Sequence, residues 1–93
     1  MYGIVLSSRA KRALRKYRRS GTFPVKKYDQ AIECLRKGEA PPRNFEDHAL
    51  SGEMASFREF HIAADLLVQY ERDDDLLVVT IIKVGTHAEL FGS

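Results

Sequence analysis

Residues 57–85 read FREFHIAADLLVQYERDDDLLVVTIIKVG, and this stretch decides the fold. Its β-branched and aromatic side chains predict strands at 56–62, 66–72 and 76–84, and the acidic triplet 73–75 predicts the turn between the last two. The third run is so rich in Val and Ile that it is typical of a central strand. Short strands joined by tight turns predict an antiparallel sheet.

Two amphipathic helices are predicted before the sheet. Residues 9–19 have apolar positions spaced i, i+3, i+4 and i+7, which is the spacing of one helix face. These positions are Ala10, Ala13, Leu14 and Tyr17. A second helix is expected to open at Pro24 and to close at Gly38. The short turn between the two helices makes them an αα-hairpin.

Shorter elements flank these helices and strands. Residues 2–6 are mostly apolar and predict a short strand, and residues 39–48 contain two adjacent prolines and predict a loop. Thr86 and Glu89 have the spacing of a capping box, which opens one last helical turn after Gly85. The expected fold is α+β, with an N-terminal strand and an αα-hairpin packed on an antiparallel sheet. We expect a single domain over 1–93.

Charge is distributed very unevenly along the chain. The net charge is only +2, but residues 1–43 carry twelve Lys and Arg against three Asp and Glu, and the remainder carries three against ten. A basic half indicates a polyanionic partner, because binding phosphates with Lys and Arg releases condensed counterions. Nucleic acid is favoured over a membrane, because no large apolar face accompanies the charge.

The sequence also indicates where the protein is located in the cell and whether it forms disulfides. No apolar stretch is long enough to cross a bilayer, and the apolar residues at the N-terminus are too few for a signal sequence. We therefore expect a cytoplasmic protein. Cys34 has no second cysteine to pair with, so we expect a free thiol without a role.

All three histidines lie beside predicted breaks in regular structure, and Asp65 follows His61 by four residues. In an antiparallel meander the strand ends of one edge converge, so His61, Asp65 and His87 could share a cleft. Imidazoles near one phosphate can act as base and acid in RNA cleavage, and Lys83 could stabilise the transition state. The histidines could instead be solvated residues without a role, or zinc ligands, although their spacing is unfavourable for a zinc site. The basic helix could serve only to keep the protein soluble.

Three motifs in order resemble one toxin family. DHALSG at 47–52, FREFHIAAD at 57–65 followed by LLVQY at 66–70, and GTHAELF at 85–91 are similar to the YafQ branch of the RelE superfamily. The resemblance implies a ribosome-dependent mRNA endonuclease of a type II toxin-antitoxin system. It implies two helices packed on an antiparallel sheet, with a cognate antitoxin, the ribosome and mRNA as partners.

The resemblance also implies roles for individual residues. His48, His61, Asp65 and His87 match the catalytic set of the family, and Phe91 matches an aromatic residue that orients the substrate base. Two positions depart from the family pattern: Lys83 stands where arginine is usual, and Leu66 where tryptophan is frequent. Lysine keeps the positive charge but loses bidentate contact with phosphate.

The expected mechanism needs no metal or other cofactor, because the ribose 2′-OH is an internal nucleophile. His48 or His61, with Asp65, would remove the 2′-OH proton, and His87 would protonate the departing 5′-oxygen. The first helix would dock the ribosome or RNA through its basic residues, which are Arg9, Lys11, Arg12, Arg15, Lys16, Arg18 and Arg19. Two other readings stay open: a ParE-like toxin that binds gyrase without nuclease activity, and an idle RNA-binding homologue.

Overall fold

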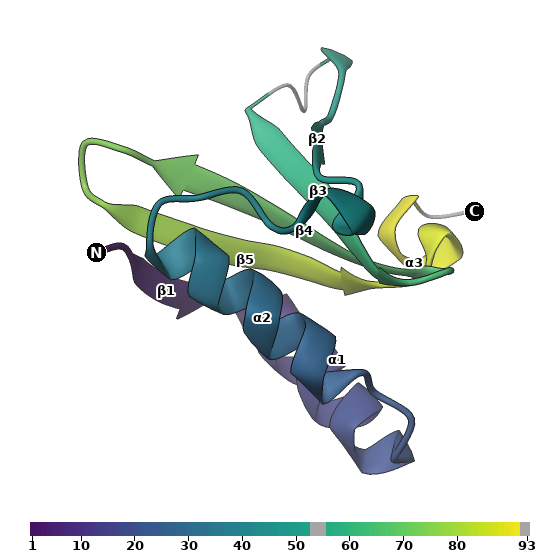
Figure 1. Ribbon diagram of the computed structural model, residues 1–93. Coiled ribbons are helices and arrows are strands. Elements are labelled where there is room, and N and C mark those ends of the chain that lie inside the picture. Colours follow the sequence, from purple (N-terminus) through teal and green to yellow (C-terminus); the bar gives the residue numbers. More distant parts are fainter. Residues whose placement is uncertain (53–55, 92–93) are drawn as a thin grey trace.

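The computed structural model describes residues 1–52 and 56–91. Its elements, in chain order, are β1 (Gly3–Leu6), α1 (Ser8–Ser20), α2 (Val25–Arg36), a 3-10 helix η1 (Arg43–Phe45), β2 (His48–Ala49), β3 (Phe57–Ala63), β4 (Leu66–Asp73), β5 (Val78–Gly85) and α3 (His87–Phe91). Helices α1 and α2 form the expected αα-hairpin and lie against one face of the sheet (Figure 1). Among the described residues, no helix has the length and hydropathy needed to cross a membrane.

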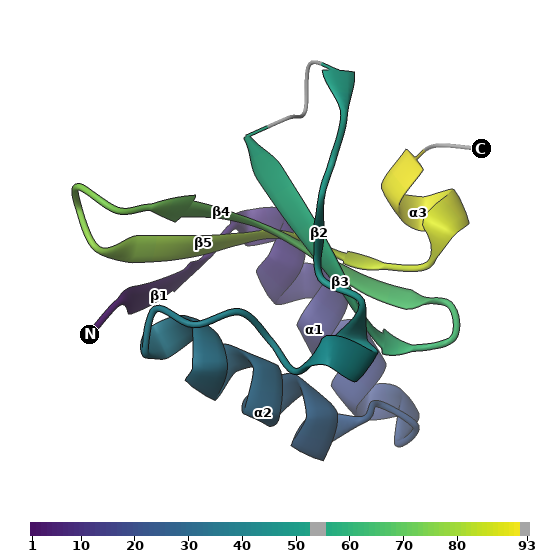
Figure 2. The same ribbon diagram turned by 45° about the horizontal axis from the view of Figure 1, so that its top comes forward.

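The sheet is mixed. Its strand order is β1-β5-β4-β3-β2, and the pairs from β2 to β5 are antiparallel as expected. The N-terminal strand β1, whose partner the sequence did not specify, pairs with β5 in parallel. The chain leaves β1 through both helices and enters the sheet again at the opposite edge (Figure 2). Such a crossover allows parallel pairing, which a tight turn cannot.

Local interactions explain where the elements begin and end. Ser7 caps α1 by accepting a hydrogen bond from the Ala10 N–H at 3.0 Å, and Gly21 ends that helix with a left-handed φ of 76°. The last hairpin turn is longer than the sequence indicates, since β5 begins at Val78. The Asp73 carboxylate accepts the N–H groups of Asp75 and Leu76, which holds the acidic segment and the residue after it in the turn.

One hydrophobic core fills the space between the helices and the sheet. The helices contribute apolar side chains that are almost completely buried, among them Leu14, Tyr28 and Leu35. The sheet contributes the residues of its inner face, which include Phe60, Ile62, Leu66, Val68, Tyr70, Val79, Ile81 and Val84. The opposite face of β3 and β4 carries polar side chains and is the face on which the candidate site lies.

A β-bulge in β5 decides which face Lys83 occupies. Gln69 pairs with Lys83 while Tyr70 pairs with Ile81, so Ile82 is an extra residue without a partner on β4. The extra residue resets the alternation of side chains, and Lys83 therefore shares the polar face with Gln69. Ser7 Oγ donates a hydrogen bond to the Ile82 carbonyl at 2.6 Å, which ties the start of α1 to the bulge.

Candidate active site

Four aromatic rings stand in a row along one end of the sheet. Neighbouring ring centroids are 6.2 Å apart for His48 and His61, 6.0 Å for His61 and His87, and 6.4 Å for His87 and Phe91. These four side chains, called the ring row below, come from β2, β3 and the two ends of α3. The structure therefore brings together all three predicted histidines and the predicted aromatic residue.

Strand register explains this convergence. His48 is opposite Glu59 on β3, two residues from His61 on the same side of the strand. At the other side, Leu67 on β4 is opposite Gly85 on β5. Asp65 in the β3–β4 turn lies two residues before Leu67, and His87 at the start of α3 lies two residues after Gly85. The turn and the start of α3 are therefore close in space.

Asp65 is held against His87 at this meeting point. One carboxylate oxygen accepts the main-chain N–H of His87 at 3.0 Å and faces its ring Nδ1 at 2.6 Å. The main-chain N–H and then the ring hold the pKa of Asp65 below its usual value. From the sequence, His61, Asp65 and His87 are expected in one cleft, with Asp65 assisting His48 or His61; in the structure Asp65 bonds His87 instead, because the register places the turn beside α3. The contact leaves Nε2 of His87 for another partner.

His48 is bound through both ring nitrogens. Nδ1 lies 2.8 Å from the Glu46 carbonyl oxygen, and Nε2 lies 3.1 Å from a carboxylate oxygen of Glu59. The second Glu59 oxygen accepts a hydrogen bond from the Gln69 side chain at 3.2 Å. Glu59 is only 4% exposed, and sequence reasoning did not identify it as a site residue. The signal was its position two residues before His61, which places both on one strand face.

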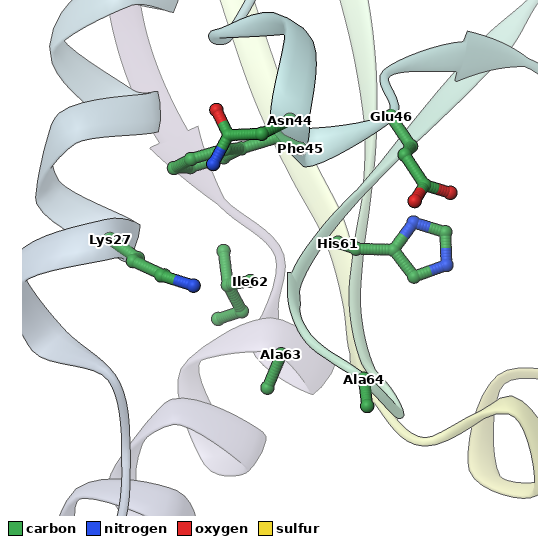
Figure 3. Close-up of a pocket in the computed structure, with 8 residues that line it drawn as sticks. All are labelled: Lys27, Asn44, Phe45, Glu46, His61, Ile62, Ala63 and Ala64. Atoms are coloured by element: carbon green, nitrogen blue, oxygen red, sulfur yellow. The ribbon is translucent and has the colours of Figure 1, made fainter.

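His61 differs from its two neighbours in the ring row. Within the described residues its ring makes no hydrogen bond, and its Nδ1 atom is buried without a partner. The Glu46 side chain points toward the ring (Figure 3). Within the described residues, His61 therefore has fewer hydrogen bonds to other protein groups than His48 or His87.

Lys83 and Phe91 contact the short helix α3. The Lys83 ammonium donates to the Leu90 carbonyl at 3.4 Å, which places its charge at the C-terminal end of α3. Phe91 is 50% exposed, and its ring is stacked on His87 with an interplanar angle of 25°. Leu66, at the other position that departs from the family pattern, is buried in the core and packs there.

A cluster around Glu89 joins α3 to the basic helix α1. The Glu89 carboxylate accepts hydrogen bonds from the Tyr17 hydroxyl, from the Thr86 N–H at 2.9 Å and from the Lys16 ammonium at 3.1 Å. These donors, with Tyr17 first, lower the pKa of Glu89 to about 2. Burial and the hydrogen bond to Glu89 raise the pKa of Tyr17 to about 12. Arg9 adds a bond to the Glu89 carbonyl at 3.2 Å.

The seven basic residues of α1 are all exposed, but they are not equivalent. Arg9 and Lys16 hold α3 through Glu89. Arg18 lies over the rings of Phe23 and Tyr28, with its guanidinium carbon 5.7 Å and 5.9 Å from their centroids. Over the part of the chain that the structure covers, no ion pair involves the remaining four, which are Lys11, Arg12, Arg15 and Arg19.

The arrangement has the groups needed for acid–base chemistry on a phosphodiester. Two imidazoles stand 6.0 Å apart, one held by a carboxylate and one free, with an exposed aromatic ring beside them. Among residues 1–52 and 56–91, no group of three or more His, Cys, Asp and Glu side chains is arranged to hold a metal ion.

Comparison with known proteins agrees with the fold and the motifs. Residues 2–92 match a family model described as the bacterial toxin of a type II toxin-antitoxin system, YafQ. A protein from Haemophilus influenzae named as a toxin YafQ is 35% identical over 65 residues, which are 68% of this chain and 64% of that protein. The mRNA interferase toxin YafQ of Escherichia coli is 37% identical over 51 residues, 55% of this chain and 53% of its own length.

Solved structures extend the likeness to nearly the whole chain. A copper-bound mutant toxin from Helicobacter pylori superposes with a TM-score of 0.88 at 31% identity and covers 98% of this chain and 100% of its own. The match to the curated relatives is shorter, since this chain spans about two thirds or less of their length.

Proposed function

This chain belongs to the YafQ family of bacterial toxins from type II toxin-antitoxin systems, and from that premise we propose that it is a ribosome-dependent endoribonuclease. The reaction is transesterification at an mRNA phosphodiester. The ribose 2′-oxygen attacks the adjacent phosphorus, the bond from phosphorus to the 5′-oxygen breaks, and the products are a 2′,3′-cyclic phosphate and a 5′-hydroxyl. One observation carries the proposal. The ring of His61, which makes no hydrogen bond within the described residues, lies beside the ring of His87, which is bound to a carboxylate.

His61 is the general base in this mechanism. Both ring nitrogens of His48 are bound to protein groups, whereas His61 makes no hydrogen bond to any residue of the described ranges. A ring without protein partners can accept the 2′-OH proton without first giving up a hydrogen bond. This assignment chooses between the two histidines that the sequence left as alternatives.

His87 is the general acid and Asp65 orients it. The carboxylate holds Nδ1, so Nε2 is the nitrogen that protonates the departing 5′-oxygen. A carboxylate that fixes one ring nitrogen of a catalytic histidine sets both the orientation and the tautomer of the ring. Phe91 stacks on the same ring and offers its free face to a nucleobase.

His48, Glu59 and Lys83 support the reaction from the sheet. Glu59 and Gln69 fix the ring of His48 at the end of the ring row, beside His61. Lys83 carries a positive charge on the same polar face as Gln69. Its charge favours the additional negative charge of the transition state.

The partners follow from the charges of the helices. The exposed basic residues of α1 dock the ribosome, whose rRNA is a polyanion. A groove of about 580 Å³ between β1, α1 and α2 has apolar walls that include Leu14 and Tyr28, and Arg15, Arg18 and Arg36 line it as well. Such a groove suits an acidic amphipathic segment of a cognate antitoxin. Action on ribosomes places the protein in the cytoplasm.

Cell-free translation with mapping of mRNA ends tests this function. We expect the wild-type protein to produce new mRNA ends within translated codons, and only when ribosomes are translating. Translation arrest without new ends, or DNA breaks in a gyrase assay, would contradict the proposed function. Ends that also arise on free RNA at the same rate would contradict the dependence on ribosomes.

A further inference from the structure

A cavity of about 300 Å³ opens beside His61, on the side of β3 that faces α2. Lys27 of α2 forms one wall, η1 and Glu46 form the second, and residues 61–64 of β3 and its turn form the third (Figure 3). This volume lies at the lower end of the range for small-molecule sites. The cavity lies beside the ring row and shares His61 with it.

An open strand edge lines this cavity. Strand β2 pairs with β3 only at Arg58 and Glu59, because the chain before β2 turns away at Glu46, whose φ is 56°. The Leu50 N–H donates to the Phe57 carbonyl, so every second residue from Phe57 directs its main-chain groups toward the β2 side. The main-chain groups of His61 therefore face that side, and no described strand pairs with them there; the alternation stops at His61, because the register of β3 with β4 shifts between His61 and Ala63.

Two polar side chains complete the cavity. Lys27 reaches from α2 toward β3, and the Asn44 amide lies on the same side of the space (Figure 3). Both residues are exposed. Opposite them, Ala63 and Ala64 have small side chains that leave room for a flat ring. The cavity thus offers amide donors and acceptors, the positive charge of Lys27 on the α2 side and the carboxylate of Glu46 beside His61.

We propose that this cavity is a nucleobase subsite, which binds the base of the nucleotide next to the cleaved bond. A nucleobase is flat and presents adjacent donors and acceptors at its edge, which match a main-chain N–H and C=O pair together with an asparagine amide. Lys27 neutralises the phosphate that this nucleotide carries. The proposal rests on the proposed function, because the RNA must reach His61 for its neighbouring nucleotide to enter.

Within the subsite Asn44 determines specificity and Lys27 determines affinity. A main-chain N–H and C=O pair fits the edge of every base and discriminates little. The Asn44 side chain can favour some bases over others, because the order of donors and acceptors differs between them. Removing the amide should lower discrimination at one nucleotide position about tenfold, the size typical of a single base contact.

End mapping over many codons in cell-free translation tests the subsite in the active protein. Asn44→Ala is expected to flatten the base preference about tenfold at one fixed position relative to the cut, while preferences at other positions persist. Lys27→Met is expected to lower cleavage at all sites to a similar extent. Lys26→Met is the matched control, because Lys26 is an exposed neighbour that does not line the cavity, and it should cut like the wild type.

The outcomes separate this proposal from the proposed function. If the wild type cuts and Asn44→Ala retains the same preference at every position, the subsite is overturned while the nuclease stands. If the wild type does not cut, the proposed function fails, and NMR titration with a trinucleotide RNA decides the subsite. Shifts of the Asn44 side-chain amide and of the His61 main-chain N–H would then support base binding, and unchanged resonances for both would overturn it.

Discussion

The Tyr17 hydroxyl of α1 donates a hydrogen bond to the Glu89 carboxylate of α3, two residues from His87. The basic helix is therefore joined directly to the helix that carries the candidate general acid. The sequence assigned α1 to docking and the histidines to chemistry, because the two sets lie in different halves of the chain. The structure places them in contact, so substitutions on α1 need not act on docking alone.

Tyr17→Phe should lower cleavage about tenfold, because α3 loses a hydrogen bond that helps to fix the position of His87 and small misplacements of catalytic groups are costly. We expect the free energy of unfolding to fall by only about 1 kcal/mol, since a hydrogen bond that is open to solvent contributes little. Single-turnover cleavage and urea unfolding measure the two effects. Tyr28→Phe is the matched control, because it also removes a tyrosine hydroxyl but one that makes no hydrogen bond within the described residues. Equal activity of Tyr17→Phe and wild type would show that α3 holds its position without this bond.

Glu89 should make stability depend on pH under acidic conditions. Its pKa falls from 4.5 to about 2 in the folded protein, so the ionised form stabilises the fold. This contribution is complete above about pH 4.5 and is lost as the pH falls toward about 2. Urea unfolding of the wild type and of Glu89→Gln at several pH values measures it. The difference between the two proteins should shrink through this window, and a constant difference would contradict the assignment.

His87→Ala should reduce cleavage by a factor on the order of 10²–10⁴, the usual contribution of a general acid or base. Asp65→Asn should cause a smaller loss, because the ring stays present but its orientation and tautomer are less well fixed. Both variants should give the circular dichroism spectrum of the wild type, since both side chains lie at the surface. Near-normal cleavage by folded His87→Ala would rule out the role as general acid.

Reversal of Arg12, Arg15 and Arg19 to glutamate should weaken ribosome binding strongly. None of the three contacts Glu89 in a hydrogen bond or ion pair, so α3 should keep its place. The remaining binding should depend less steeply on salt concentration, because fewer counterions are released. Salt titration of ribosome binding measures the slope. An unchanged affinity and slope would show that the basic face of α1 only confers solubility and would move the docking role to the loop around Arg43.

Cleavage should survive chelation by EDTA once enough magnesium is restored to keep ribosomes assembled. The 2′-OH is an internal nucleophile, and imidazoles supply the proton transfers, so the proposed steps involve no metal. End mapping in EDTA-treated extract, with magnesium added back, measures this. A further requirement for copper, zinc or manganese would contradict the mechanism.

The sequence by itself determined the two long helices, the three long strands and the residue types of the candidate site, but not η1, β2 or the start of β5. Helical periodicity placed α1, and the capping box of Thr86 and Glu89 is present in the structure, where each residue bonds the main-chain N–H of the other. Local patterns of this kind succeed because helix faces and caps depend on residues within four positions of each other. The motifs around the three histidines likewise identified the family, which the match over residues 2–92 confirms.

Tertiary structure alone decided which groups touch. The pairing of Asp65 with His87 follows from the register of β4 with β5, and the face of Lys83 follows from a bulge at Ile82. The parallel pairing of β1 and the contact between Tyr17 and Glu89 join segments that are far apart in the chain. One sequence pattern is compatible with several registers, so long-range partners become fixed only when the core packs and every side chain takes its face.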